Sequence, residues 1–158
     1  MPMRAAERRL ATAYWLLRVV LGGGLFLAGL DKFFDLITNW SMYMSPLAER
    51  WLPVDEKVFL HAVGILEMAL GLGVLIGLVR WASYAVAAWL LAIAANLALS
   101  GNFWDLCLRD LEIATAAFVL GRLSAWRREA LESSLAPGEP GYETLARRLE
   151  GGHPARPG

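Results

Sequence analysis

Hydrophobic and polar residues are distributed along this chain in long blocks. Mainly apolar stretches cover about 13–34, 58–79, 81–99 and 103–123, with two short turns and one longer connection, 35–57, between them. A run of about 20 mainly apolar residues is long enough to cross a lipid bilayer as a helix. The pattern therefore predicts an all-α, polytopic membrane protein with a four-helix transmembrane bundle over 13–123.

Two more polar segments flank this predicted bundle. Residues 1–12 carry several arginines, and residues 124–158 begin as a predicted interfacial helix and end in a glycine- and proline-rich stretch that we expect to be disordered. The first apolar stretch contains Arg18 and continues unbroken to Leu30, which argues against a cleaved signal peptide. The connection 35–57 is expected to contain a short helix, and Asp55 is the predicted start of the second long helix.

The composition supports a membrane protein and limits its chemistry. Hydrophobic residues make up 57% of the chain and charged residues 19%, against about 45–50% apolar residues in a soluble domain. Lysine plus arginine and aspartate plus glutamate number 15 each, and no nucleic-acid partner is predicted. The single cysteine, Cys107, excludes an intrachain disulfide and any thiol relay that needs a cysteine pair. We expect no haem or metal to be held by this chain alone.

The positions of the basic residues predict an orientation. Most arginines fall at the two ends of the chain and at the turn around Arg80. The opposite side of the predicted bundle holds only Lys32, Arg50, Lys57 and Arg109. Positive charge favours the cytoplasmic side, so both termini are predicted to be cytoplasmic.

Small and charged residues share faces on the first two predicted helices. On the first helix that face contains Arg18, Gly22, Leu25, Gly29 and Lys32, and on the second it contains Gly64, Glu67 and Gly71. Small residues let neighbouring helices approach closely. Lys32 is therefore predicted to point into the bundle, and Glu67 is predicted to point into a tight helix contact. A further pair, Gly73 and Gly77, is a weaker signal because glycine is common in membrane helices.

The fourth predicted helix begins with several charges. Asp105, Arg109 and Glu112 lie at i, i+4 and i+7, on one face, and Asp110 lies about 100° around the helix from Arg109. Such a face cannot point to lipid unless its charges are paired or reach water. We expect it to turn into the bundle.

The predicted topology places nearly all of these polar groups in the outer half of the membrane. Two interpretations remain open: a pocket that opens to the outer face, or ion pairs that only fix helix register, with Arg109 bound to Asp105 or Asp110 and Lys32 bound to Glu67. In the pocket interpretation, Trp40 or Trp104 forms a wall for a ring-shaped ligand. The candidate catalytic residues are Lys32, Glu67, Arg109 and Asp110, and the candidate binding residues are Asp31, Trp40, Asn96, Trp104, Asp105 and Glu112.

Several of these segments resemble the DoxX family. They are Gly29-Leu-Asp-Lys-Phe33, Gly64-Ile-Leu-Glu-Met-Ala-Leu-Gly71 with Gly77-Leu-Val-Arg80, the region of Asn96, and Arg109-Asp110. The resemblance covers roughly residues 14–123. It implies a small four-helix protein of the inner membrane of a bacterium or archaeon, related to the membrane subunit of thiosulfate:quinone oxidoreductase. The family's polar positions correspond here to Lys32, Glu67, Asn96, Arg109 and Asp110.

Three functions are compatible with the residues and the resemblance. The first is a quinone-linked oxidoreductase subunit, in which Lys32 or Arg109 polarises a quinone carbonyl and Glu67 or Asp110 exchanges protons. The second is a non-catalytic subunit of a larger respiratory or redox complex. The third is a small-solute or proton-coupled carrier that uses Glu67. The expected partners are the lipid bilayer and either other subunits or further copies of this chain.

Overall fold

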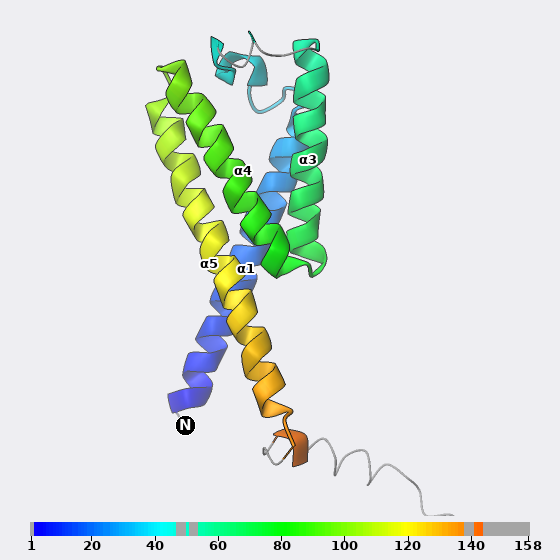
Figure 1. Ribbon diagram of the computed structural model, residues 1–158, viewed down its shortest axis with the longest axis vertical. Coiled ribbons are helices and arrows are strands. Elements are labelled where there is room, and N and C mark those ends of the chain that lie inside the picture. The colour runs from blue at the N-terminus through cyan, green and yellow to red at the C-terminus, as the bar shows by residue number, and fades with distance from the viewer. Residues whose placement is uncertain (1, 47–49, 51–53, 138–140, 144–158) are drawn as a thin grey trace, which may run out of the picture. The chain divides into compact units, whose positions relative to one another are not determined.

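Four long helices form the frame of the protein (Figure 1). The computed structural model describes residues 2–46, 50, 54–137 and 141–143. In these ranges the long helices are α1 (Pro2–Asp31), α3 (Glu56–Ile76), α4 (Val79–Ser100) and α5 (Trp104–Ser134), and a short 3-10 helix, η1 (Trp40–Tyr43), follows α1. The predicted all-α class is therefore confirmed.

Three of these helices are long and apolar enough to cross a membrane: residues Arg9–Asp31 of α1, the whole of α3 and the whole of α4. α5 is not among them, because charged residues interrupt its first turns and its last third is polar. That α5 also crosses the membrane stays a prediction, as does the orientation of the termini.

The helix ends follow from local capping groups. The side chain of Asp55 accepts a hydrogen bond from the backbone N–H of Lys57 at 2.9 Å, which confirms the predicted start of α3. Gly77 ends α3 with φ +119°, and Gly101 ends α4 with φ +76°. Both values lie in the left-handed region, where glycine has no steric penalty. α1 begins at Pro2, so the residues expected to precede the first helix belong to it.

The closest helix contact joins α1 to α3, which lie side by side (Figure 1). A methyl group built on Gly29 would lie 2.6 Å from the carbonyl oxygen of Gly64, and one built on Gly71 would lie 2.6 Å from that of Gly22. Only glycine permits the two backbones to come so near. The two glycine faces found in the sequence thus pack against each other, a pairing that the sequence did not specify.

The second helical pair, α4 and α5, closes the bundle through larger side chains. Gly121 of α5 lies against the ring of Tyr84, and this ring also contacts Phe118 at 5.6 Å between centroids. The main core is made of Tyr14, Val74, Val79, Val86, Ala87, Leu90, Ala114, Ala117 and Leu120, which come from all four long helices.

The weaker glycine pair of α3 has an internal role. Gly73 faces Ala82 of α4, where an added methyl group would lie 3.2 Å from the Ala82 Cβ. Gly77 is the residue at which α3 ends. Gly73 therefore lets α4 pack against α3, and Gly77 forms the end of α3.

Residues 124–158 form a second compact unit, separate from residues 1–123. Its described part contains the end of α5, with an exposed Arg128–Glu132 ion pair at 3.5 Å one turn apart. The helix ends at Ser134, just before the Pro-Gly segment expected to break it. The end that we predicted to be disordered, 151–158, lies outside the described residues.

Candidate functional site

A cavity of about 820 Å³ lies among α1, α3, α4, α5 and the connection after α1. Its walls are mainly apolar and extend along α1 from Lys32 to Val20, which is ~18 Å along a helix axis. The polar residues that line it are Lys32, Thr38, Trp40, Tyr43, Glu67, Trp89, Asn96, Arg109 and Asp110. A volume of this size is typical of pockets that bind small ligands.

The ion pair between Lys32 and Glu67 is the polar centre of one wall. Lys32 Nζ lies 2.5 Å from Glu67 Oε2, and the two side chains are only 5% and 3% exposed. The nearby contact between Gly29 and Gly64 holds the two backbones close enough for this bond. Trp89 Nε1 donates a 3.4 Å hydrogen bond to the other oxygen, Oε1. Two buried charges thus neutralise each other, as the low polarity of a membrane interior requires.

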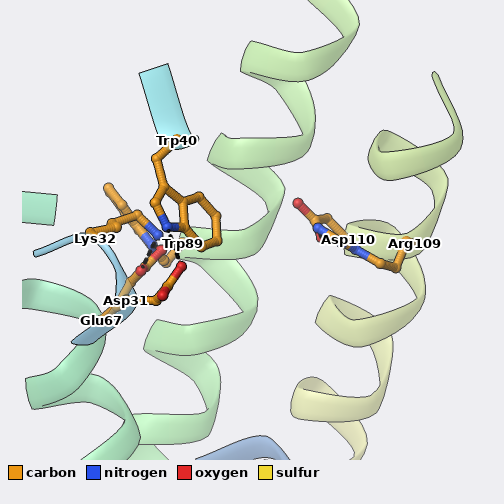
Figure 2. Close-up of polar contacts among 7 residues, drawn as sticks. All are labelled: Asp31, Lys32, Trp40, Glu67, Trp89, Arg109 and Asp110. Carbon is orange, nitrogen blue, oxygen red and sulfur yellow. Dashed lines mark hydrogen bonds and ion pairs between the residues drawn. The ribbon is translucent and has the colours of Figure 1, made fainter. Parts of the chain in front are cut away.

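The ring of Trp40 covers Lys32 on its other side (Figure 2). Lys32 Nζ lies 3.5 Å from the ring centroid, which is a cation–π contact. Asp31 fixes this ring, because Trp40 Nε1 donates to Asp31 Oδ2 at 2.9 Å. Asp31 Oδ1 also accepts the backbone N–H groups of Leu36 and Ile37, at 3.0 Å each. The buried Asp31 therefore shapes the connection but is not among the residues that line the cavity.

Asn96 fastens the far end of the same connection to α4. Its Nδ2 donates to the carbonyl oxygen of Tyr43 at 2.9 Å, and its Oδ1 accepts from the backbone N–H of Ser45 at 3.2 Å. The side-chain amide is thus occupied by backbone groups. Asn96 lines the cavity, and its observed hydrogen bonds indicate that it positions the connection.

Arg109 and Asp110 form a second polar group on α5, which Figure 2 shows apart from the group around Lys32. Arg109 Nε and Nη2 both bond to Asp110 Oδ1, at 3.1 and 3.0 Å. The Asp110 side chain is buried, whereas that of Arg109 is 55% exposed. Both residues line the cavity, so the two groups face one shared space from different helices.

Three candidate binding residues of α5 are placed elsewhere. Trp104, Asp105 and Glu112 are exposed and do not line the cavity. The expectation that the face of Asp105, Arg109 and Glu112 turns into the bundle is wrong for Asp105 and Glu112, whereas Arg109 reaches the cavity. The buried positions of α5 are Cys107, Asp110, Ala114 and Ala117, with spacings of three and four, and they direct the charged face outward.

Two polar contacts were not anticipated from the sequence. Arg18 donates to the carbonyl oxygens of Val74 and Leu75, at 2.9 and 2.6 Å, and so satisfies free groups in the last turn of α3. Trp89 was not singled out, although a tryptophan near the middle of an apolar helix, away from both interfaces, requires a partner for its N–H.

Charged side chains suited to metal binding are not grouped in the described part of the chain. No set of three or more histidine, cysteine, aspartate or glutamate residues is placed there to hold an ion. The cavity instead combines a buried ammonium group, carboxylates, indole rings and a long apolar wall. Such a lining suits an amphipathic organic ligand whose polar end carries hydrogen-bond acceptors.

Comparison with protein families identifies the family of this helical bundle. Residues 13–100 match the DoxX family model. The chain belongs to the DoxX family. The matched segment contains α3, α4, most of α1 and Lys32, which directly follows α1, whereas α5 lies beyond it. DoxX proteins are integral membrane proteins, so the cavity lies inside a multi-pass membrane bundle. No curated protein and no solved structure matches this DoxX chain.

Proposed function

We propose that this protein binds a membrane quinone in the cavity and acts as a quinone-linked oxidoreductase subunit. The observation that carries the proposal is the position of the Lys32–Glu67 pair on a mainly apolar cavity that Asp110 also lines. A quinone ring has two carbonyl oxygens on an otherwise apolar ring. It therefore needs polar groups at two places and apolar walls elsewhere, which is the distribution of side chains in this cavity.

Each polar group has a role in this reaction. Reduction of a quinone to a quinol takes up two electrons and two protons. The Lys32 ammonium group donates a hydrogen bond to one carbonyl oxygen and stabilises the negative charge that develops there. Glu67 and Asp110 exchange protons as the ring is reduced or oxidised. The electrons come from a partner subunit or from a reduced donor molecule.

The existing contacts of Lys32 limit the direction from which a ligand can approach its ammonium group. Glu67 and the Trp40 ring already occupy two sides of the ammonium group. A quinone oxygen reaches Nζ from the side of the cavity, and the ring stacks against an indole. Asp31 holds Trp40 in place, and Trp40 covers one side of Lys32. Asp31 and Trp40 together therefore fix the side from which a ligand reaches Lys32.

The accessory-subunit interpretation has its own support. Lys32, Glu67, Arg109 and Asp110 already have partners within the chain. Ion pairs of this kind are sufficient to fix the register of helices without any ligand. In that case the cavity holds lipid, and the protein contributes to the assembly of a larger membrane complex.

Native mass spectrometry of the protein, extracted gently from its own membrane, distinguishes these two functions. We expect a bound mass that matches a quinone, and we expect Lys32→Met and Glu67→Gln to lose it while the protein remains folded. Lys57→Met and Glu56→Gln are matched controls, because they remove the same charges at exposed positions at the start of α3. Both controls should retain the adduct.

Two results contradict the quinone proposal. One is a stoichiometric second protein with no small-molecule adduct on the unaltered chain. The other is that Lys32→Met loses the assembled form of the protein to the same extent as it loses the adduct. Size-exclusion chromatography measures the assembled form. Either result favours the accessory subunit.

A further inference from the structure

The outward face of α5 carries charges at a depth where lipid should lie. Asp105, Arg109 and Glu112 follow one another along this face, and all three are exposed. Arg109 and Ile113 line the same cavity as Glu67, so Glu112, between them in sequence, lies at the level of the cavity. An ionised group exposed to hydrocarbon at that level is costly unless something covers it.

Only part of this charge is neutralised within the chain. Arg109 bonds to Asp110 through Nε and Nη2, and its side chain still remains 55% exposed. Among the residues that the structure describes, no ion pair or hydrogen bond reaches the carboxylates of Asp105 or Glu112. The face therefore has two acidic groups without a partner and one half-exposed arginine between them.

The order of the charges makes this face complementary to itself. An acidic residue lies on each side of Arg109, four positions before it and three positions after it. In two parallel α5 helices at the same depth, the two Arg109 residues lie at the same height, and each lies diagonally ~6 Å along the axis from Asp105 of the other copy and ~4.5 Å from Glu112. Both offsets are within reach of an arginine side chain. Leu108 and Leu111, which are 60% and 38% exposed, add apolar surface beside the charges.

We propose that a second copy of this chain docks on this face, α5 against α5, in a symmetric dimer. Parallel helices are required, because both copies lie in the membrane with the same orientation. In such a dimer each Arg109 bonds to an acidic side chain of the other copy in addition to its own Asp110. The same surface patch on both copies forms the contact, as is usual for two-fold dimers. The proposal does not depend on a quinone in the cavity.

A charge-exchange experiment tests the pairing directly. Variant one carries Arg109→Glu, and variant two carries Asp105→Lys and Glu112→Lys. Each variant alone places like charges across the contact, so each should run as a monomer in mild detergent where the unaltered chain runs as a dimer. When the two variants are co-expressed with different affinity tags, opposite charges face each other again. Tandem purification should then recover a dimer that contains one copy of each variant. Its yield should be at least tenfold higher than when a single variant is co-expressed under both tags.

The recovery of a mixed dimer also shows that both variants fold. If the unaltered chain is monomeric, or if the single variants remain dimeric, the proposed contact is wrong. The same conclusion follows if co-expression yields no mixed dimer although circular dichroism shows that each variant is folded.

Cross-linking in the native membrane provides a second readout without detergent. In a Cys107→Ala background, Leu108→Cys should form a disulfide-linked dimer under mild oxidation. Leu72→Cys, at an exposed position of α3, is the matched control and should stay uncross-linked. A cross-link from position 108 to a different protein, or equal cross-linking at positions 72 and 108, would overturn the proposal.

Discussion

Lys32 is surrounded by an acidic group, an aromatic ring and an open cavity. Glu67 bonds to Nζ on one side and Trp40 covers another, while the remaining side faces the space that we propose for a quinone. The pair costs free energy to bury, since both ions lose their water, and its mutual attraction offsets that cost only while both partners are present. Its contribution to stability is therefore conditional on both residues.

Removing one partner should be worse than removing both. We expect Lys32→Met to destabilise the bundle by about 3–5 kcal/mol, because it leaves Glu67 as an uncompensated buried acid. Lys32→Met combined with Glu67→Gln should recover most of this loss, since glutamine is uncharged and still accepts from Trp89. Reversible unfolding in mixed micelles measures both values. A double variant no more stable than Lys32→Met would show that the charge left on Glu67 is not the cause.

At the scale of helices, α1 and α3 form the rigid part of the site. Their glycine contacts set the distance between backbones, and the Lys32–Glu67 bond lies beside the contact between Gly29 and Gly64. Arg18 fastens the other end of the pair by bonding to the last turn of α3. Side-chain bonds thus join the two helices at two levels, near Lys32 and near Arg18, in addition to the glycine contacts.

A single methyl group should be enough to disturb this helix pair. Gly71→Ala places its Cβ 2.6 Å from the Gly22 carbonyl oxygen and 2.7 Å from the backbone nitrogen of Phe26, so one backbone has to move. We expect a loss of about 1–3 kcal/mol, typical of overpacked cores. Gly23→Ala is the control, because a methyl group there meets nothing within 4 Å. Equal unfolding free energies for the two variants would contradict the close contact seen here.

At the scale of the whole bundle, one connection covers part of the cavity. Residues 35–46 run from the end of α1, held by Asp31, to the backbone groups held by Asn96 on α4. Thr38, Trp40 and Tyr43 from this connection line the cavity. The connection therefore joins the α1–α3 pair to α4 and shapes the space between them.

Asn96→Leu should loosen this connection while leaving the helices intact. The substitution keeps the side-chain size and removes both hydrogen bonds to the backbone at Tyr43 and Ser45. We expect amide hydrogen exchange in residues 41–46 to rise at least tenfold, with protection in α3 and α4 unchanged. Asn102→Leu is the control, since Asn102 is exposed and bonds only to nearby Ser100. Unchanged exchange in Asn96→Leu would show that this residue does not hold the connection.

The sequence by itself determined the class of fold, the glycine faces of the first two helices and the intramembrane charges that need partners. These features depend on local composition and on periodicity: apolar runs of membrane length, glycines spaced on one helix face, and opposite charges placed next to them. Lys32, Glu67 and Asp110 could be identified for the same reason, because a charge inside an apolar stretch must find a partner.

Only the tertiary structure decided which face of α5 packs into the bundle and how the connection after α1 is held. The charges of α5 lie on more than one face, and periodicity alone cannot say which face packs inward; the small buried residues Ala114 and Ala117 select the face of Asp110. Trp89 and Asn96 bond to residues far away in the chain, and Trp40 is placed by a turn that Asp31 fixes. No local sequence pattern specifies which residues such contacts join. The outward position of Asp105 and Glu112, on which the proposed dimer rests, is likewise a consequence of how the helices pack.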